Sequence, residues 1–365
     1  FENLLPDLME VREFVAAKVH ANSSDHFDLL MAIGHDCVGS LLITDKEDPE
    51  CFKDKTPTGT PLSDKQIGET IRNLKSQPLG MEYDIEDFRI SLAGVQEKTA
   101  LLYWENKWQR PIGVTPTTHI IKPAMKFETS DLDMTTSVHN EYFCMKICKE
   151  FGVNVANVDI ENFDGEIVLV VERFDRLIKK NIIYRKPQED MCQALGYFSN
   201  RKYQSEKGPS VKDFVSVLET SVRRQEDLET LFKSLLVFFV LGAIDGHAKN
   251  YSIQYVKEGH QLAPLYDILS IFPALSVKEI GIGKYKMALS VGKSNHYTAK
   301  RIQRRHFIET AKFCQIAEDR ADEIINDVKS SIVNEIWKDI DYSDKFDHII
   351  KDRIVDGMKI VFHKL

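Results

Sequence analysis

Short apolar runs separated by turn residues dominate the chain between residues 88 and 171, a pattern typical of β-strands. The dipeptide Asp164-Gly165 favours a tight turn, so the runs on either side of it should form a hairpin. A helix interrupts the strands after Ser137, with apolar residues at helical spacing until Phe151-Gly152 ends it. The pattern predicts strands at 88–92, 99–104, 119–122, 158–161 and 166–171.

Helical periodicity takes over after residue 173. The stretch 228–244 is apolar almost throughout, which indicates a buried helix, and 305–365 has the pattern of amphipathic helices. Two short strands, 251–256 and 261–265, lie between them. The chain therefore predicts an α+β fold with two lobes, a strand-rich one over 1–172 and a mainly helical one over 173–365.

The first ninety residues predict short helices and a single strand. Ser63 and Gln66 form a capping-box pattern that should open a helix ending near Ser76. The run 38–44 is apolar enough to predict the strand.

Composition narrows the class of protein. Hydrophobic residues make up 43% of the 365 positions and charged residues 28%, which excludes a disordered or collagen-like chain. The longest apolar run, 235–244, is too short to cross a bilayer, and no charged-then-apolar leader opens the sequence. Six cysteines lie without metal-ligand spacing, and the pair Cys144 and Cys148 fits a helix core better than a metal site. We expect a cytoplasmic protein without a membrane partner.

The segment from Asp245 to Asn250 holds the strongest candidate chemistry. An Asp followed five positions later by an Asn is the spacing of a protein-kinase catalytic loop, where the carboxylate accepts a hydroxyl proton and the amide oxygen binds Mg²⁺. Asp267 follows across the predicted hairpin, where kinases place a second metal-binding Asp, but Ile-Leu replaces Phe-Gly after it. Alone, the spacing also fits a polar turn after a helix.

Phosphoryl transfer also needs cations at the nucleotide. Lys122 ends a strand and is the candidate lysine for the α/β-phosphates, with Glu141 on the next helix to orient it; a surface ion pair is the alternative. The turn from Ser91 to Thr99 matches neither a Walker A loop nor a kinase glycine loop, and spacing alone predicts a hairpin turn. Glu172–Phe174 follows an apolar strand where the two lobes join, the position of an adenine-binding hinge.

Basic residues gather in one place despite the net charge of −8. Six of them lie within fourteen positions that end at His306. A solvated helix face and a phosphate-binding face both fit this cluster. At helical spacing, four of its residues should share one side of a helix: Lys300, Arg301, Arg304 and Arg305.

These motifs together resemble the HipA family of bacterial serine/threonine kinase toxins. The resemblance covers most of the chain in the family's order, and it implies a protein-kinase-like fold with ATP and Mg²⁺ as cofactors. The matching segments are Phe88–Leu102, Thr115–Lys122, Asn140–Tyr142, Val171–Arg176, Pro187–Gln193, Asp245–Asn250 and Tyr266–Asp267.

The resemblance implies a role for each motif. Asp245 would be the catalytic base, and Asn250 and Asp267 would hold the metal. Ser91 would be the autophosphorylated serine that silences the kinase, since about two negative charges there would repel the ATP phosphates. The nucleotide would contact Ala93, Gly94, Val95, Gln96, Glu97, Lys98, Lys122, Glu172, Arg173, Phe174, His247, Lys249, Asn250, Tyr266 and Asp267.

The resemblance also implies partners. The chain is similar to the short form of the family, HipT, which leads us to expect a tryptophanyl-tRNA synthetase as the target, or else the glutamyl enzyme, with inhibition of translation as the result. A DNA-binding HipB-like antitoxin, a small HipS-like antitoxin and operator DNA at Lys300, Arg301, Arg304 and Arg305 would be the other partners. A long-form toxin that lacks its first residues would look the same. Two alternatives stay open: an ATP-binding pseudokinase that acts as a co-repressor scaffold, and a small-molecule kinase.

Overall fold

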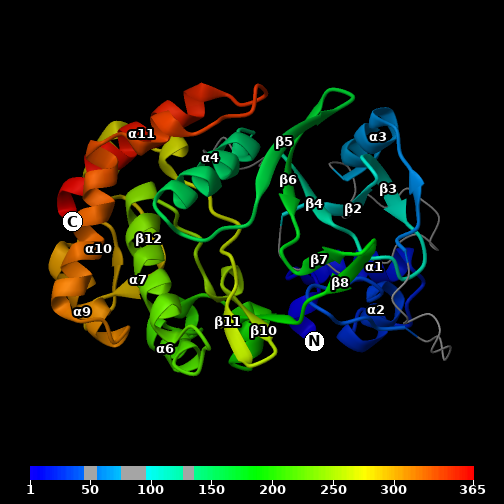
Figure 1. The fold of residues 1–365 in the computed structure, drawn as a ribbon, viewed down its shortest axis with the longest axis horizontal. Helices are drawn as coiled ribbons and strands as arrows, with labels where there is room; N and C mark the ends of the chain where they lie inside the picture. The colour runs from blue at the N-terminus through cyan, green and yellow to red at the C-terminus, as the bar shows by residue number, and fades with distance from the viewer. Residues whose placement is uncertain (45–55, 75–95, 126–134) are drawn as a thin grey trace. The chain divides into compact units, whose positions relative to one another are not determined.

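The fold is described from a computed structural model, which describes residues 1–44, 56–74, 96–125 and 135–365. The chain forms two compact units: unit 1 comprises Phe1–Lys126 and Asn157–Glu189, and unit 2 comprises Phe127–Ala156 and Asp190–Leu365. The sequence placed a single boundary at residue 172, whereas the chain passes between the units three times. Helix α4 (Ser137–Glu150) packs against α11 (His348–Val361), which explains why its segment belongs with the helical unit (Figure 1).

Unit 1 is built on a six-stranded sheet with the order β1-β3-β2-β4-β6-β5, and its recorded pairings are all antiparallel. Helix α3 (Asp64–Leu74) packs on β5 and β6 through Ile67 and Ile71, which join a core with Ile121 and Val168. The strands are β1 (Gly59–Pro61), β2 (Thr99–Trp104), β3 (Lys107–Pro111), β4 (His119–Pro123), β5 (Val158–Phe163) and β6 (Glu166–Glu172).

Local sequence signals in unit 1 are mostly confirmed. The Ser63 and Gln66 side chains cap α3 reciprocally, and Asp164-Gly165 turns β5 into β6 with both residues at positive φ. The strand predicted at 38–44 is wrong. Gly39 adopts φ +78° and donates its N–H to the Asp175 carboxylate at 2.7 Å, so the segment bends instead of pairing. The strand predicted at 88–92 lies outside the described residues.

The remaining elements of unit 1 are short. Helices α1 (Met9–Lys18) and α2 (His26–Ile33) enclose their own small core around Leu5 and Leu29. Strands β7 (Arg176–Lys179) and β8 (Ile182–Arg185) form a separate hairpin, and β9 (Gln188–Asp190) spans the point where the chain enters unit 2.

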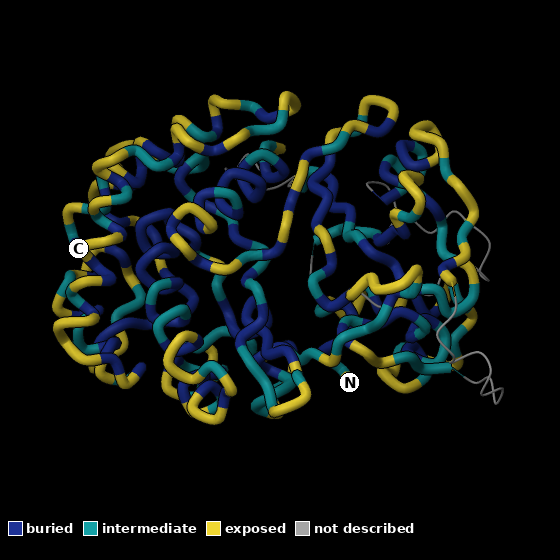
Figure 2. Tube along the Cα trace, in the orientation of Figure 1, coloured by how far each residue is buried: buried dark blue, intermediate teal, exposed yellow. Residues whose placement is uncertain are grey.

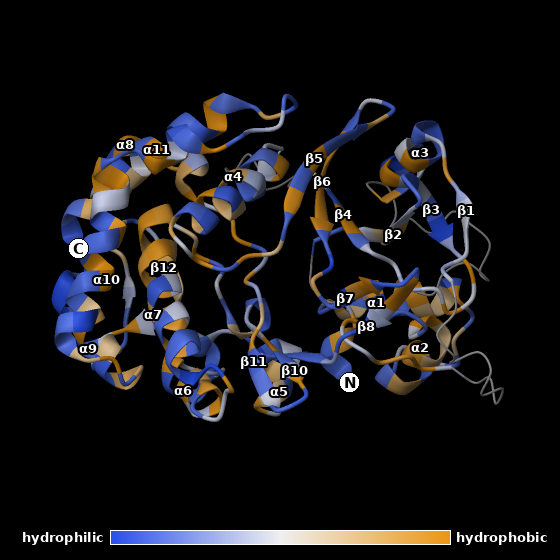
Figure 3. Cartoon of the chain, in the orientation of Figure 1, coloured by the Kyte–Doolittle hydropathy of each residue, from blue (hydrophilic) through white to orange (hydrophobic). Residues whose placement is uncertain are grey.

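Unit 2 surrounds the apolar helix α7 (Arg224–Leu241), which is buried along most of its length (Figure 2). The hairpin predicted after it is present as β10 (Ser252–Val256) and β11 (Gly259–Leu262), in a sheet ordered β11-β10-β9. Hydrophilic and apolar residues alternate along the outer helices α9 and α10 (Figure 3), as their amphipathic pattern predicts. The other elements are α5 (Met191–Ala194), α6 (Val211–Leu218), α8 (Val277–Gly281), β12 (Lys286–Val291), β13 (His296–Thr298), α9 (Arg304–Phe313) and α10 (Glu318–Val333).

Candidate active site

The predicted catalytic loop begins where α7 stops. Gly242 ends the helix at φ +63°, and the N–H of Ala243 returns to the Phe238 carbonyl at 2.8 Å, which turns the chain out of the core. A Cβ on Gly242 would lie 2.4 Å from the Phe272 ring, so packing as well as φ requires glycine. The polar segment that follows therefore starts from a rigid apolar base.

Short-range hydrogen bonds give the loop one shape. The N–H of His247 donates to the Asp245 carbonyl at 2.8 Å, and the N–H of Asn250 donates to the His247 carbonyl at 2.9 Å. The Asn250 side-chain amide donates to the same Asp245 carbonyl at 2.7 Å. Since the amide nitrogen is committed to the loop, the Asn250 Oδ1 atom is directed away from it, where it can accept a cation.

The residues of the loop differ in how far their side chains are exposed. The side chain of Asp245 is 55% exposed, whereas His247, Lys249 and Asn250 are only 5–6% exposed. A carboxylate held at the surface by a buried loop is accessible to an acceptor hydroxyl. Tyr203 donates its hydroxyl to Asp245 Oδ1 at 2.5 Å. Sequence spacing cannot predict this contact, because the two residues are 42 positions apart.

The segment that carries Asp267 is tied directly to this loop. The Tyr266 hydroxyl donates to the Lys249 carbonyl at 2.7 Å and lies 2.7 Å from the Ser252 hydroxyl. Residues adjacent to Asn250 and Asp267 are thereby hydrogen-bonded to each other. Asp267 itself adopts φ +62°, an uncommon conformation for a residue other than glycine and one that occurs often at functional sites.

Asn140 anchors the residues beyond Asp267. Its amide forms a reciprocal pair with the backbone of Ser270, donating to the carbonyl at 2.7 Å and accepting from the N–H at 2.8 Å. The Ser270 hydroxyl donates to the Leu241 carbonyl at 2.5 Å, at the last residue of α7. Ser270 therefore joins α4, the end of α7 and the Asp267 segment, although sequence analysis assigned it no role.

Metal ligands of the kinase type fit this arrangement. Among the described residues there is no cluster of three or more His, Cys, Asp or Glu side chains arranged to hold a metal ion. A kinase site needs none, because one Asn, one Asp and phosphate oxygens supply the ligands. Asn250 and Asp267 would supply one Asn and one Asp of this kind, and both would offer oxygen atoms, which Mg²⁺ prefers.

Unit 1 holds the predicted phosphate-binding lysine inside its sheet. Lys122 lies on β4 opposite Leu169 of β6 and is 6% exposed. Next to it, the Gln96 side chain donates to the Pro123 carbonyl at 3.4 Å, which brings the residues before β2 onto the end of β4. Of the predicted phosphate loop, only Gln96, Glu97 and Lys98 are described; Ser91, Ala93, Gly94 and Val95 lie outside the described residues.

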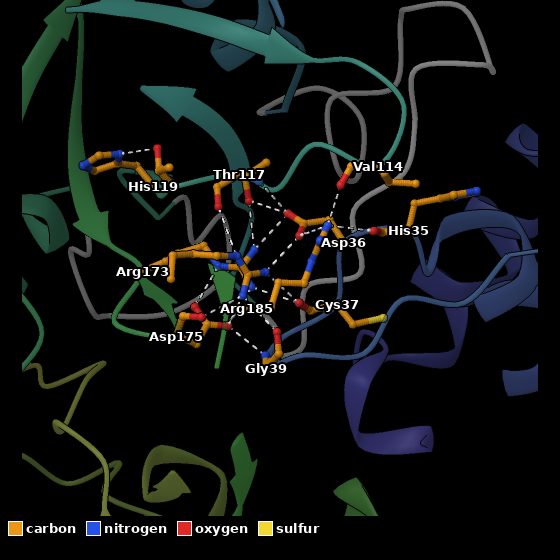
Figure 4. Close-up of polar contacts among 12 residues, drawn as sticks. His35, Asp36, Cys37, Gly39, Val114, Thr117, His119, Arg173, Asp175 and Arg185 are labelled. Carbon is orange, nitrogen blue, oxygen red and sulfur yellow. Dashed lines mark hydrogen bonds and ion pairs between the residues drawn. The ribbon is translucent and has the colours of Figure 1, made fainter. Parts of the chain in front are cut away.

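The residues of the predicted hinge, Glu172–Phe174, lie in different environments. The Glu172 carboxylate is at the surface and accepts a hydrogen bond from Asn157 at 2.8 Å. Arg173 is 4% exposed, and every N–H of its guanidinium donates within the protein, to the side chains of Asp36, Thr117 and Asp175 and to the Cys37 carbonyl (Figure 4). The Arg173 side chain is therefore a structural element of unit 1.

Arg173 belongs to a buried ionic cluster. Arg176 and Arg185 join it, so three guanidinium groups share the two carboxylates of Asp36 and Asp175. Burial alone would raise the pKa of Asp175, but Arg173 and Arg176 outweigh it and lower that pKa to about 2. The cluster fastens the segment around Asp36 to the residues just before β4, to those just after β6 and to the β7–β8 hairpin.

The basic segment differs from its prediction. Helix α9 begins at Arg304, and Lys300 and Arg301 lie in the turn before it, so the four residues do not share one helix face. Arg304 is paired with Asp322 at 2.7 Å. Lys300, Arg301 and Arg305 are exposed, and no ion pair to any of them is recorded among the described residues.

Known proteins resemble this chain over nearly its whole length. A family model of the HipA-like C-terminal domain matches residues 90–336, and one of the HipA N-terminal domain matches residues 1–44. The protein named "Putative kinase Y4mE" from Sinorhizobium fredii is 35% identical over 301 residues, which are 80% of this chain and 67% of that protein. The serine/threonine-protein kinase toxin HipA of Shewanella oneidensis is 30% identical over 291 residues, 74% of this chain and 62% of that toxin. The chain thus spans about two thirds of the length of these relatives.

A solved structure confirms the predicted fold class. HipA of Shewanella oneidensis, in a complex with HipB and its operator DNA, superposes with a TM-score of 0.72 at 21% identity, covering 98% of this chain and 84% of that one. The mixed α+β architecture is that of HipA. Among the described residues, no helix is both long and apolar enough to cross a membrane.

Proposed function

The chain belongs to the HipA family, and we propose on that premise that it is an ATP-dependent serine/threonine protein kinase acting as a toxin. The observation that carries the proposal is the catalytic loop. An exposed Asp245 carboxylate stands on a buried loop whose Asn250 is locked through its amide nitrogen, and Tyr266 attaches Asp267 to that same loop. These are the groups that phosphoryl transfer requires, in the order the family has them.

Each residue then has a distinct task. Asp245 accepts the proton of the acceptor hydroxyl while the hydroxyl oxygen bonds to the γ-phosphorus and the bond to ADP breaks. Asn250 and Asp267 would hold Mg²⁺, which would neutralise charge on the phosphates. Lys122 and the loop from Ala93 to Lys98 bind the phosphates, and His247, Lys249 and Tyr266 also contact the nucleotide. The backbone of Glu172–Phe174 contacts the adenine. Glu172 is exposed and Phe174 half-buried, so both are more accessible than the buried Arg173 side chain.

The resemblance supports a target and partners. We propose that the phosphorylated protein is an aminoacyl-tRNA synthetase, the tryptophanyl enzyme first and the glutamyl enzyme next, and that its modification inhibits translation. A HipB-like antitoxin bound to operator DNA is a second partner, since the Shewanella oneidensis HipA is found with HipB and operator DNA. The short HipT-like form, a small HipS-like antitoxin and silencing by phosphorylation of Ser91 stay predictions.

The decisive test is transfer of labelled phosphate from ATP to each purified synthetase. We expect transfer by the wild type and a loss of about 10²-fold or more in Asp245→Asn, because the general base is removed. Asp356→Asn, the same change at an exposed position of α11, is the control and should keep full activity. No transfer by the wild type, or undiminished transfer by Asp245→Asn, would refute the kinase proposal. Intact mass before and after ATP, in wild type and Ser91→Ala, tests autophosphorylation.

One observation favours a second role beside the first. Lys300, Arg301 and Arg305 present exposed positive charge on a protein whose net charge is −8. Such a patch suits phosphate groups of operator DNA. If the chain were a pseudokinase scaffold, the double charge reversal Lys300→Glu/Arg301→Glu would abolish its effect on antitoxin–DNA affinity. Asp245→Asn would then leave both that effect and any growth arrest unchanged.

A further inference from the structure

Tyr203 makes a contact with the proposed catalytic base that no sequence motif accounts for. Its hydroxyl donates to Asp245 Oδ1 at 2.5 Å, and its ring meets the His247 ring edge-on with the centroids 4.9 Å apart. One phenol therefore touches two members of the loop from Asp245 to Asn250. We propose that Tyr203 is a positioning residue that orients the Asp245 carboxylate for phosphoryl transfer, an inference that rests on the proposed kinase function.

The backbone on both sides of Tyr203 is anchored. The Lys202 carbonyl accepts the N–H of Ala248 at 3.2 Å, which joins this segment to the catalytic loop through the main chain. The Gln204 side chain forms a reciprocal pair with Ser290 on β12, donating to its hydroxyl at 2.8 Å and accepting its N–H at 2.9 Å. A side chain between two such anchors has little freedom, so its hydrogen bond fixes a direction for its partner.

The contact divides the two oxygens of Asp245 between different tasks. Oδ1 is occupied by the Tyr203 hydroxyl, while Oδ2 lies 3.9 Å from the His247 ring nitrogen Nε2. With Oδ1 held by Tyr203, the carboxylate cannot rotate freely, and Oδ2 has a fixed direction in which to receive the acceptor's proton. Because the Asp245 side chain is 55% exposed, water would otherwise allow several orientations.

Two titratable side chains face the Asp245 carboxylate, those of Tyr203 and His247, and the Lys202 ammonium lies 5.6 Å from the centre of the Tyr203 ring. A hydroxyl donated to one carboxylate oxygen limits the orientations of the whole group. Removing that hydroxyl should let the Asp245 carboxylate turn more freely.

Tyr203→Phe removes the hydroxyl and keeps the ring against His247. We expect kcat for phosphoryl transfer to fall by roughly 10- to 100-fold with little change in KM for ATP. Tyr255→Phe, the same change on the exposed face of β10, is the matched control and should leave both unchanged. An unchanged kcat in Tyr203→Phe would overturn the proposal.

A second measurement does not depend on activity. Carboxyl ¹³C NMR of the whole protein at a single pH, with the Asp245 signal assigned by its loss in Asp245→Asn, follows the surroundings of this one group. Tyr203→Phe should change its chemical shift because the hydroxyl contact is lost, and Tyr255→Phe should not. A chemical shift that does not change would disprove the coupling even if the wild type transfers phosphate.

The two readouts also separate failure of this inference from failure of the kinase proposal. If the wild type transfers no phosphate but the chemical shift changes in Tyr203→Phe, the coupling holds and the kinase proposal fails. If ATP places phosphate on Tyr203 itself, detected by peptide mass spectrometry, the hydroxyl is an acceptor and the positioning role is overturned.

Discussion

Removing the charge of Asp36 should strongly lower the free energy of unfolding of unit 1. In Asp36→Asn the three guanidinium groups of the buried cluster keep a single carboxylate, that of Asp175. The lost partners of Asp36 lie close: Arg176 at 2.8 Å, Arg173 at 3.1 Å and Arg185 at 3.4 Å. Breaking one member of a buried ion cluster costs about 3–5 kcal/mol, because the remaining charges stay buried without compensation.

The control is an aspartate of the same unit at the surface. Asp164 pairs with Arg72 at 2.8 Å, but both side chains are at least 40% exposed, so Asp164→Asn should cost at most about 1 kcal/mol. Urea unfolding can report unit 1 alone in a Trp337→Phe background, since the other two tryptophans, Trp104 and Trp108, belong to unit 1. If both variants lose the same stability within about 0.5 kcal/mol, the cluster does not stabilise unit 1 as we infer.

Acid should weaken the same cluster. Because the pKa of Asp175 is held at about 2, below its ordinary value of 3.8, its contribution is fully present above about pH 4 and is lost as the pH falls towards 2. Roughly two pKa units correspond to about 2–3 kcal/mol. Unfolding of unit 1 measured between pH 5 and pH 2 should therefore show a loss of this size, and a flat stability over that range would contradict the assignment.

Three further predictions concern unit 2. Gly242→Ala should lower the free energy of unfolding in urea by roughly 3 kcal/mol, and Gly113→Ala by roughly 1 kcal/mol. Both glycines have φ +63°, so the backbone strain is the same, but only at Gly242 would the added Cβ meet the Phe272 ring. Asn140→Ala leaves the backbone of Ser270 without its buried partner, so it should cost about 2 kcal/mol and lower phosphate transfer; unaltered activity would deny that the Asp267 segment needs this anchor. Asn250→Ala should raise the Mg²⁺ concentration that gives half-maximal transfer, and an unchanged titration would exclude Asn250 as a ligand.

Much of the fold follows from local sequence patterns. The β5–β6 hairpin, helix α3 with its cap, and the long helix α7 are confirmed because each depends on interactions within a short stretch: a turn dipeptide, a reciprocal cap and an apolar run. The strand predicted at 38–44 failed for the opposite reason. Its residues meet Asp175 and Arg176, more than 130 positions away, and those contacts bend the chain at Gly39.

The candidate site shows the same division. The spacing from Asp245 to Asn250 and the position of Asp267 were enough to predict a kinase loop, since those residues are close in sequence or joined by a hairpin. Arg173 was predicted as a hinge residue, and only the packed structure revealed that its guanidinium is hydrogen-bonded to Asp36 and Asp175. Lys300 and Arg301 looked helical, but α9 begins only at Arg304.

What this sequence determined by itself is the set of reactive groups and the local elements that carry them, because capping, turn geometry and apolar periodicity act over a few residues. The tertiary structure alone decided which distant residues meet: Tyr203 and Asp245, Ser270 and Asn140, and the arginines and Asp36. Those partners are chosen by burial, since a polar group that leaves water must find its hydrogen bonds wherever the fold brings a donor or acceptor.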